Sequence, residues 1–157
     1  MSFTPVTKYD LTNDELDFLR DLTKQGTKFL LVGMLAAIFQ GADGITRDID
    51  LWFQTTSDEG LDKAARNQGG LFVWRGNPPY LQGNSLARVD VVTTCHGLGS
   101  FEKEYARAHD LDLGEFSIKV LPLERIIVSK TAANREKDWR ALPSLKAAFV
   151  SWKAMMR

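Results

Sequence analysis

The sequence has few of the features that mark secreted or membrane-spanning proteins. Its 157 residues include a single cysteine, Cys95. An internal disulfide is therefore excluded, and we expect a reducing, cytoplasmic environment. The longest apolar run, residues 29–39, is interrupted and is shorter than the roughly 20 residues that a bilayer span requires. No apolar segment follows a basic N-terminal start, so we expect neither a signal peptide nor a membrane partner.

Net charge is also absent, because 20 Lys and Arg balance 20 Asp and Glu. No overall field attracts nucleic acid, and the length predicts one globular domain, residues 1–157. From residue 121 onward, however, there are eight Lys or Arg and three Asp or Glu. We expect this segment to form helices packed on the domain, over about residues 123–157. Its charges either are ordinary solvated surface charges or face an acidic cleft that holds phosphates and metal.

The rest of the chain is organised around residues 29–53, FLLVGMLAAIFQGADGITRDIDLWF. Residues 29–32 are apolar like a buried strand, residues 34–40 are compatible with a short helix, and a glycine-rich loop follows. Residues 48–53 alternate between polar and apolar, which predicts a half-buried strand. At Gly33 a strand opens into a helix, a turn whose free N–H groups favour phosphate.

Two aspartates share one face of the strand at residues 48–53. Period two places Asp48 and Asp50 on the same side, with backbone positions roughly 6.5 Å apart. Two carboxylates at this spacing can converge on a hard divalent cation such as Mg²⁺ or Mn²⁺. They can also be solvated charges at a sheet edge, or pair with Arg47 and a neighbour.

A third aspartate, Asp90, lies in the β-branched run at residues 87–93. The run predicts a strand in the interior of a sheet, where an isolated carboxylate needs a partner. Asp90 either pairs with a nearby arginine such as Arg88, or completes a metal site with Asp48 and Asp50. The presence of the aspartate pair favours the metal site.

Lys130 lies on the apolar stripe of a helix expected over residues 123–134. A lysine in this position either snorkels to solvent or extends into a cleft, where its ammonium would neutralise phosphate charge. We expect a final helix to begin at Pro143, with Phe149 and Trp152 packed inward.

The adjacent Cys95 and His96 invite a nucleophile or zinc interpretation. Neither is expected, because there is no second cysteine, His109 is distant in sequence, and adjacent side chains of an extended segment point apart.

The remaining patterns complete an α/β fold, a small mixed, twisted sheet flanked by helices. They predict an irregular segment at residues 1–10, helices near 14–24, 57–67 and 101–109, and strands near 71–74, 80–82 and 116–120. The site is expected at the end of the strands that carry Gly33, Asp48 and Asp50.

Two blocks of the sequence resemble the nucleotidyltransferase superfamily, above all its minimal members of the abortive-infection and toxin–antitoxin-associated type. The first block matches at Gly33, Ala36, Gly41, Thr46, Asp48, Asp50 and Leu51. The second, P-L-E-x-I-x-x-S-K-x-A-A-x-R-x-K-D, matches at Lys130, Arg135, Lys137 and Asp138. Met34 departs from the family pattern, which has Gly or Ser at that position.

The resemblance implies a nucleotidyltransferase-like fold and metal-dependent transfer of a nucleoside monophosphate from a nucleoside triphosphate to an acceptor hydroxyl. The implied catalytic residues are Asp48, Asp50, Asp90 and Lys130, the three aspartates being ligands of Mg²⁺ or Mn²⁺. The implied nucleotide contacts are Gly33, Met34, Thr46, Lys130, Arg135 and Lys137. The acceptor stays open between a protein, an RNA and a small molecule.

The alternative is a non-catalytic binding module, or a toxin–antitoxin component with a cognate partner. Met34 supports this alternative, because a long side chain at the helix start would crowd the phosphates. Three carboxylates that bind nothing would cost stability, which argues against it. Between these, we expect weak nucleotide affinity rather than none.

Overall fold

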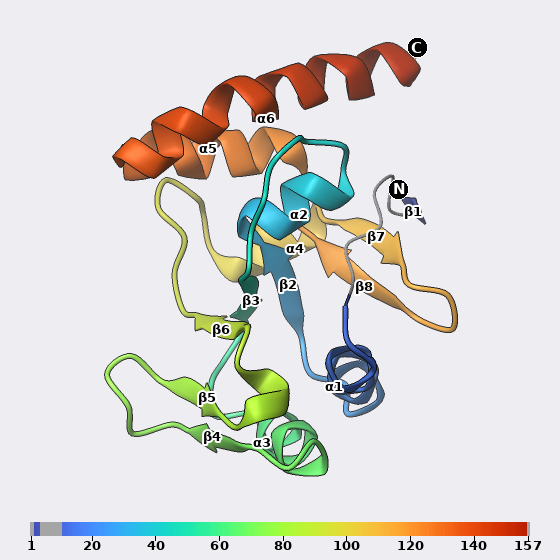
Figure 1. Ribbon diagram of the computed structural model, residues 1–157, viewed down its shortest axis with the longest axis vertical. Coiled ribbons are helices and arrows are strands. Elements are labelled where there is room, and N and C mark those ends of the chain that lie inside the picture. Colours follow the sequence, from blue (N-terminus) through green and yellow to red (C-terminus); the bar gives the residue numbers. More distant parts are fainter. Residues whose placement is uncertain (1, 4–10, 157) are drawn as a thin grey trace.

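The computed structural model describes residues 2–3 and 11–156, which form two sheets and six α-helices (Figure 1). The elements are β1 (Ser2–Phe3), α1 (Asn13–Lys24), β2 (Phe29–Val32), α2 (Gly33–Phe39), β3 (Ile49–Phe53), α3 (Glu59–Asn67), β4 (Leu71–Val73), β5 (Tyr80–Gln82), a short 3-10 helix (Asn84–Leu86), β6 (Val89–Val92), α4 (Phe101–Ala106), β7 (His109–Asp112), β8 (Ser117–Val120), α5 (Leu123–Ala133) and α6 (Glu136–Met155). Across the described ranges, no helix combines the length and apolarity of a membrane span.

The larger sheet contains six strands in the order β1-β7-β8-β2-β3-β6. It is mixed, because β2 runs antiparallel to β3 and parallel to β8, while β3 and β6 are parallel. All four residues of β2 are buried, as are all residues of β3 except Asp50, which is partly buried. Strands that are apolar on both faces belong inside a sheet covered on both sides. The predicted mixed sheet flanked by helices is confirmed.

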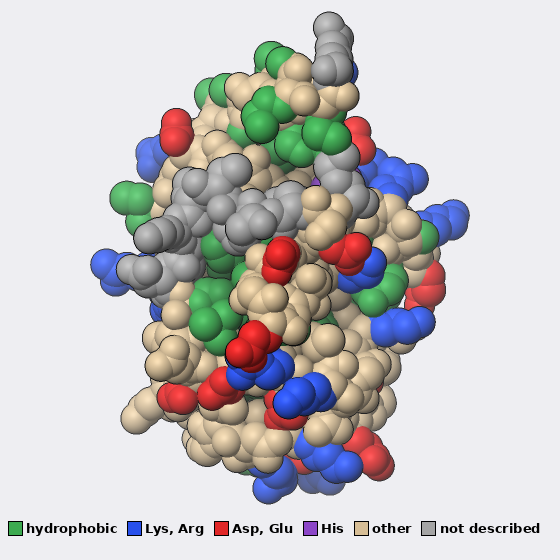
Figure 2. All heavy atoms as spheres, turned by 90° about the vertical axis from the view of Figure 1, so that its right-hand side faces the viewer, with side chains coloured by type: hydrophobic (Ala, Val, Ile, Leu, Met, Phe, Trp, Pro, Cys, Tyr) green, Lys and Arg blue, Asp and Glu red, His purple; other side chains and the backbone are tan. Residues whose placement is uncertain are grey.

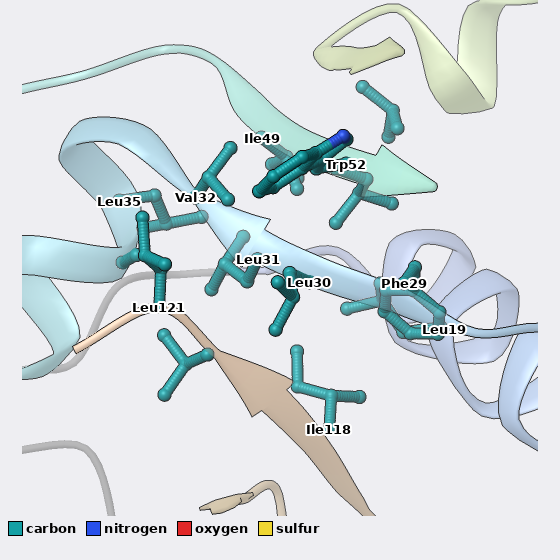
Figure 3. Close-up of a cluster of buried hydrophobic side chains, with 14 of the residues drawn as sticks. Leu19, Phe29, Leu30, Leu31, Val32, Leu35, Ile49, Trp52, Ile118 and Leu121 are labelled. Atoms are coloured by element: carbon teal, nitrogen blue, oxygen red, sulfur yellow. The ribbon is translucent and has the colours of Figure 1, made fainter. Parts of the chain in front are cut away.

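The core is built around β2. Figure 3 shows its leucines between side chains of α2, β3 and β8. Leu30, Leu31 and Leu121 are each at most 1% exposed. Burying a leucine side chain completely contributes roughly 1.5–3 kcal/mol, so this layer fixes the position at which β2 passes into α2.

A capping box begins α1 where the sequence predicts it. The Thr12 hydroxyl accepts the N–H of Glu15 at 3.0 Å, and the Glu15 carboxylate accepts the N–H of Thr12 at 2.9 Å. The same buried carboxylate accepts Nε of Arg88 at 2.8 Å. The start of α1 is thereby tied to the residue that precedes β6.

The last helix, α6, begins at Glu136, so its predicted start at Pro143 is wrong. The backbone N–H of Arg135 donates to the Asp138 carboxylate at 3.1 Å, which caps the helix about two turns before the sequence pattern indicates. Pro143 lies inside the helix at an exposed position. There its missing N–H removes one hydrogen bond without burying an unpaired group. Phe149 and Trp152 are partly buried against the core, as predicted.

Two short strands were not predicted. Ser2–Phe3 pairs with β7 in parallel, where an irregular lead was expected, and residues 4–10 of that lead lie outside the described residues. The expected helix over residues 101–109 ends at Ala106, and His109 begins β7. Ser2–Phe3 is too short to show a period in the sequence.

Candidate functional site

Two adjoining clefts lie between the sheet and the helices α5 and α6. The Asp90 cleft, about 390 Å³, is lined among others by Gly33, Asp48, Asp50, Asp90, Lys130, Arg135 and Lys137. The Met34 cleft, about 410 Å³, is lined among others by Met34, Thr46, Asp48, Asp50, Lys130, Lys137 and Arg140. The two clefts share Asp48, Asp50, Lys130 and Lys137. Asp48 directly precedes β3 and Asp50 lies in it, so acidic residues at β3 and basic residues of α5 and α6 form the common wall.

Asp50 occupies the centre of this wall. Backbone pairing places it opposite Val32 at the end of β2 and beside Asp90 in the parallel register of β6. Gly33 has a φ of 73°, and a Cβ atom added there would lie 2.4 Å from Oδ2 of Asp50. The carboxylate therefore rests against the glycine backbone, a contact that any side chain at position 33 would displace.

The neighbouring aspartates contribute to raised pKa values of Asp50 and Asp90. The pKa of Asp50 is raised to about 6 by burial, then by the negative charges of Asp90 and Asp48, while Lys130 and Lys137 act in the opposite direction. Burial of the carboxyl group and the charge of Asp48 also raise the pKa of Asp90, against a hydrogen bond with Asp50. Such mutual repulsion is relieved when a cation binds between the groups.

Asp90 does not lie in the interior of the sheet, so that prediction is wrong. β6 is the edge strand, and Asp90 as a residue is exposed while Val89 is buried. β-branched residues suit any half-buried pleated strand, so the run did not distinguish an edge from a centre. The alternative, a pairing of Asp90 with Arg88, is not seen among the described residues, where Arg88 binds Glu15.

The donor chemistry of the aspartates fits a divalent cation. Asp48, Asp50 and Asp90 line one cleft and offer only carboxylate oxygens, the ligands that Mg²⁺ and Mn²⁺ prefer. As their side chains stand, no three Asp, Glu, His or Cys residues within the described part of the chain are arranged to hold a metal ion. Convergence of all three carboxylates on one ion stays a prediction.

Lys130 extends into the clefts rather than snorkelling to solvent. Its side chain is 18% exposed, and Nζ lies 3.4 Å from Oδ1 of Asp138. The ammonium also lowers the pKa of Asp50 from across the cleft. Lys130 thus stands between a buried aspartate on α6 and the acidic residues of the sheet.

Asp138 binds basic residues at the junction of α5 and α6, on the helical side of the clefts. The sequence pattern did not predict this role. The Asp138 side chain is fully buried and accepts Nε of Arg135 at 2.7 Å in addition to the backbone N–H of Arg135 and the ammonium of Lys130. Burial acts to raise its pKa, but the hydrogen bonds from Arg135 and the charge of Lys130 bring it below the ordinary value. The signal available in the sequence was an aspartate three residues after Arg135, the spacing of a capping box.

The loop between α2 and β3 forms the wall of the Met34 cleft. A Cβ atom added to Gly44 would lie 2.3 Å from Cε of Met34, so the methionine side chain packs directly on that glycine. The Thr46 hydroxyl accepts the N–H of Asp48 at 3.2 Å, which orders the entry into β3. The Met34 side chain therefore narrows the Met34 cleft. It does not line the Asp90 cleft.

Cys95 and His96 also line the Asp90 cleft. The pKa of Cys95 is raised to about 12 by burial, then by the charges of Asp50 and Glu104. A thiol that holds its proton so firmly is a poor nucleophile and a poor metal ligand. That the Cys-His pair is not the reactive centre stays a prediction.

The whole arrangement sets carboxylates of the sheet against cations of α5 and α6. A ligand that carries both phosphate groups and a divalent cation would complement both walls at once. No protein-family model matches this chain, and no curated protein matches it.

Proposed function

We propose that the two clefts form the site of a metal-dependent nucleotidyltransferase with a nucleotidyltransferase-like fold. It moves a nucleoside monophosphate from a nucleoside triphosphate to an acceptor hydroxyl. The observation that supports this most is the pairing of Asp50 and Asp90 in register on neighbouring strands, facing Lys130 across one cleft. The sequence resemblance points to the same chemistry.

Asp48, Asp50 and Asp90 are the residues that would hold Mg²⁺ or Mn²⁺. When bound, such an ion neutralises phosphate charge and lowers the pKa of a coordinated hydroxyl. The raised pKa values of Asp50 and Asp90 support this role, because a nearby cation would lower both pKa values and favour the ionised carboxylates.

The residues of the site have separate roles in the proposed transfer. Asp90 accepts the proton of the acceptor hydroxyl, whose oxygen forms a bond to the α-phosphorus as the bond to pyrophosphate breaks. Lys130 and Lys137 stabilise the negative charge that the departing pyrophosphate retains. Arg135 binds Asp138 through Nε and Nη2, so Nη1 would be its donor to a phosphate oxygen. Gly33 leaves the backbone accessible beside Asp50.

The test is label transfer. The protein is incubated with each nucleoside triphosphate labelled at the α-phosphate, with magnesium and a cell extract, and the extract is resolved into protein, RNA and small molecules. We expect label in one of these fractions, and its loss in Asp50→Asn. Glu59→Gln, an exposed change on α3, is the matched control. Absence of transfer with any nucleotide would contradict the proposed activity.

A second candidate, a non-catalytic binding module such as a toxin–antitoxin component, is favoured by one observation. Met34 packs on Gly44 and narrows the cleft that continues from the aspartates. This candidate predicts nucleotide binding or partner binding without transfer of label. Whether a cognate toxin or antitoxin partner exists belongs to the same proposal.

A further inference from the structure

The solvent-facing side of α6 is apolar. One side of the helix is buried through Asp138, Leu145 and Ala148. The opposite side carries five exposed apolar residues at spacings of four, four, three and four, here called the outer stripe: Trp139, Pro143, Ala147, Val150 and Ala154. Surface helices normally carry polar residues there. Figure 1 shows α6 at the rim of the molecule, and Figure 2 shows hydrophobic side chains gathered at the end where its C-terminal part lies.

The two largest residues of the outer stripe are far from buried. Trp139 is 55% exposed and Val150 is 67% exposed, and Met155 just beyond the stripe is 78% exposed. The indole N–H of Trp139 donates to Oδ1 of Asn134 at 2.6 Å, which holds the ring at the turn between α5 and α6. A fixed, exposed tryptophan is the kind of side chain that anchors protein interfaces.

The flanks of the outer stripe are basic. Residues 139–156 contain three Lys or Arg, which are Arg140, Lys146 and Lys153, and no Asp or Glu. Arg140 pairs with Glu136 at 2.7 Å, whereas Lys146 lies exposed beside the stripe. An occupant must therefore present apolar side chains with acidic residues on either side of them.

The basic flanks and the sizes of the side chains in the outer stripe distinguish between the possible binding partners of this surface. Two copies joined through the outer stripe would bring basic flanks together, which disfavours self-association. A lipid surface requires bulky side chains to insert, but Pro143, Ala147 and Ala154 are small. Small side chains instead let a second helix approach closely, at interaxial distances of about 8–10 Å. RNA would use the basic flanks and leave the apolar stripe exposed.

We propose that the outer stripe of α6 binds an α-helix of another protein, apolar along one side and acidic along both flanks. This interaction surface is separate from the clefts and goes beyond nucleotidyl transfer.

The test uses a labelled helical peptide of about three heptads, with leucine at the core positions and glutamate at the flanking positions. Binding to the full chain is measured by fluorescence anisotropy at physiological salt. The same peptide with lysine in place of glutamate, anionic phosphatidylglycerol vesicles and a single-stranded RNA are the comparison probes. Sedimentation of the protein alone reports self-association.

We expect saturable binding of the glutamate peptide that weakens about tenfold or more in Ala147→Glu, because the charge would be buried against apolar and acidic groups. Val150→Glu should act in the same way, and Lys63→Glu on α3 should not. Circular dichroism checks that each variant is folded. The proposal is overturned if the glutamate peptide does not bind, if both stripe variants bind it normally, if vesicles or RNA bind in its place, or if the protein alone forms a dimer that Ala147→Glu dissociates.

Discussion

Gly33 and Asp50 are held in a contact that allows no side chain at position 33. Replacing Gly33 with alanine would place a Cβ atom 2.4 Å from Oδ2 of Asp50, at a φ of 73°. We expect Gly33→Ala to destabilise the protein by about 2–4 kcal/mol in urea unfolding, from backbone strain and the clash together.

Gly26→Ala is a matched control for that change. Gly26 has a φ of 75°, but a Cβ atom added there meets nothing within 4 Å. Its replacement therefore reports the backbone conformation alone, about 1 kcal/mol. Equal losses for the two variants would show that the close approach of Asp50 to Gly33 does not constrain the site.

Asp50 should make stability depend on pH between about 4 and 6. Its pKa is raised from 3.8 to about 6 in the folded protein, so the folded state binds this proton more tightly than the unfolded state does. The stabilisation is complete below about pH 4 and is lost as the pH rises through about 6. We expect Asp50→Asn to be more stable than the unmodified protein at pH 8 by about 1–2 kcal/mol, and similar in stability near pH 4. Urea unfolding at the two pH values measures this, and an identical pH dependence in both proteins would refute it.

Met34 controls the space available to a nucleotide. Because its side chain lies on Gly44 in the wall of the Met34 cleft, replacement by serine or glycine should open that cleft. We expect weak triphosphate binding by the unmodified protein and tighter binding by Met34→Ser, measured by calorimetric titration with magnesium present. Met155→Ser, on the exposed end of α6, is the control. Tight binding by the unmodified protein would show that Met34 is no obstacle.

At the scale of elements, the junction of α5 and α6 depends on one buried carboxylate. Asp138 caps α6 and neutralises Lys130 and Arg135 at once. We expect Asp138→Asn to destabilise the protein by about 2–4 kcal/mol, because it leaves a nearly buried ammonium without its counter-charge. Glu136→Gln breaks only the exposed pair with Arg140 and should change stability by less than about 1 kcal/mol. Thermal unfolding of both variants measures the two losses of stability. Equally small losses for the two variants would contradict the structural role of Asp138.

The elements with strong local signals could be predicted from the sequence. Thr12 with Glu15 marks the start of α1, and the apolar run before Gly33 marks β2. Their signals are a cap and a hydrophobic period, which are properties of adjacent residues. The start of α6 and the edge position of β6 depend on contacts between distant residues, so the pattern around Pro143 and Asp90 was misleading.

Only part of the candidate site could be predicted from the sequence. Period two placed Asp48 and Asp50 on one face, and the structure brings Asp90 beside them by pairing β6 with β3. That pairing cannot be read from spacing, and neither can the burial of Asp138. Assignment of the aspartates and of Lys130 to catalysis and metal binding stays a prediction.

At the scale of the whole molecule, acidic and basic groups cancel in number, and at the Asp90 cleft they lie on different walls. Carboxylates of the sheet face cations of α5 and α6, and the acidic side is held together against its own repulsion. A ligand that binds only the folded state raises its stability by mass action. A divalent cation at the aspartates should therefore stabilise the entire fold.

Thermal unfolding in millimolar Mg²⁺ or Mn²⁺, compared with a chelator, tests this most directly. The unmodified protein should melt a few degrees higher with metal, and Asp50→Asn should lose that response while remaining folded. Glu115→Gln, an exposed change away from the clefts, should respond like the unmodified protein. A melting temperature unchanged by either metal, or raised equally in Asp50→Asn, would contradict a metal site at Asp48, Asp50 and Asp90.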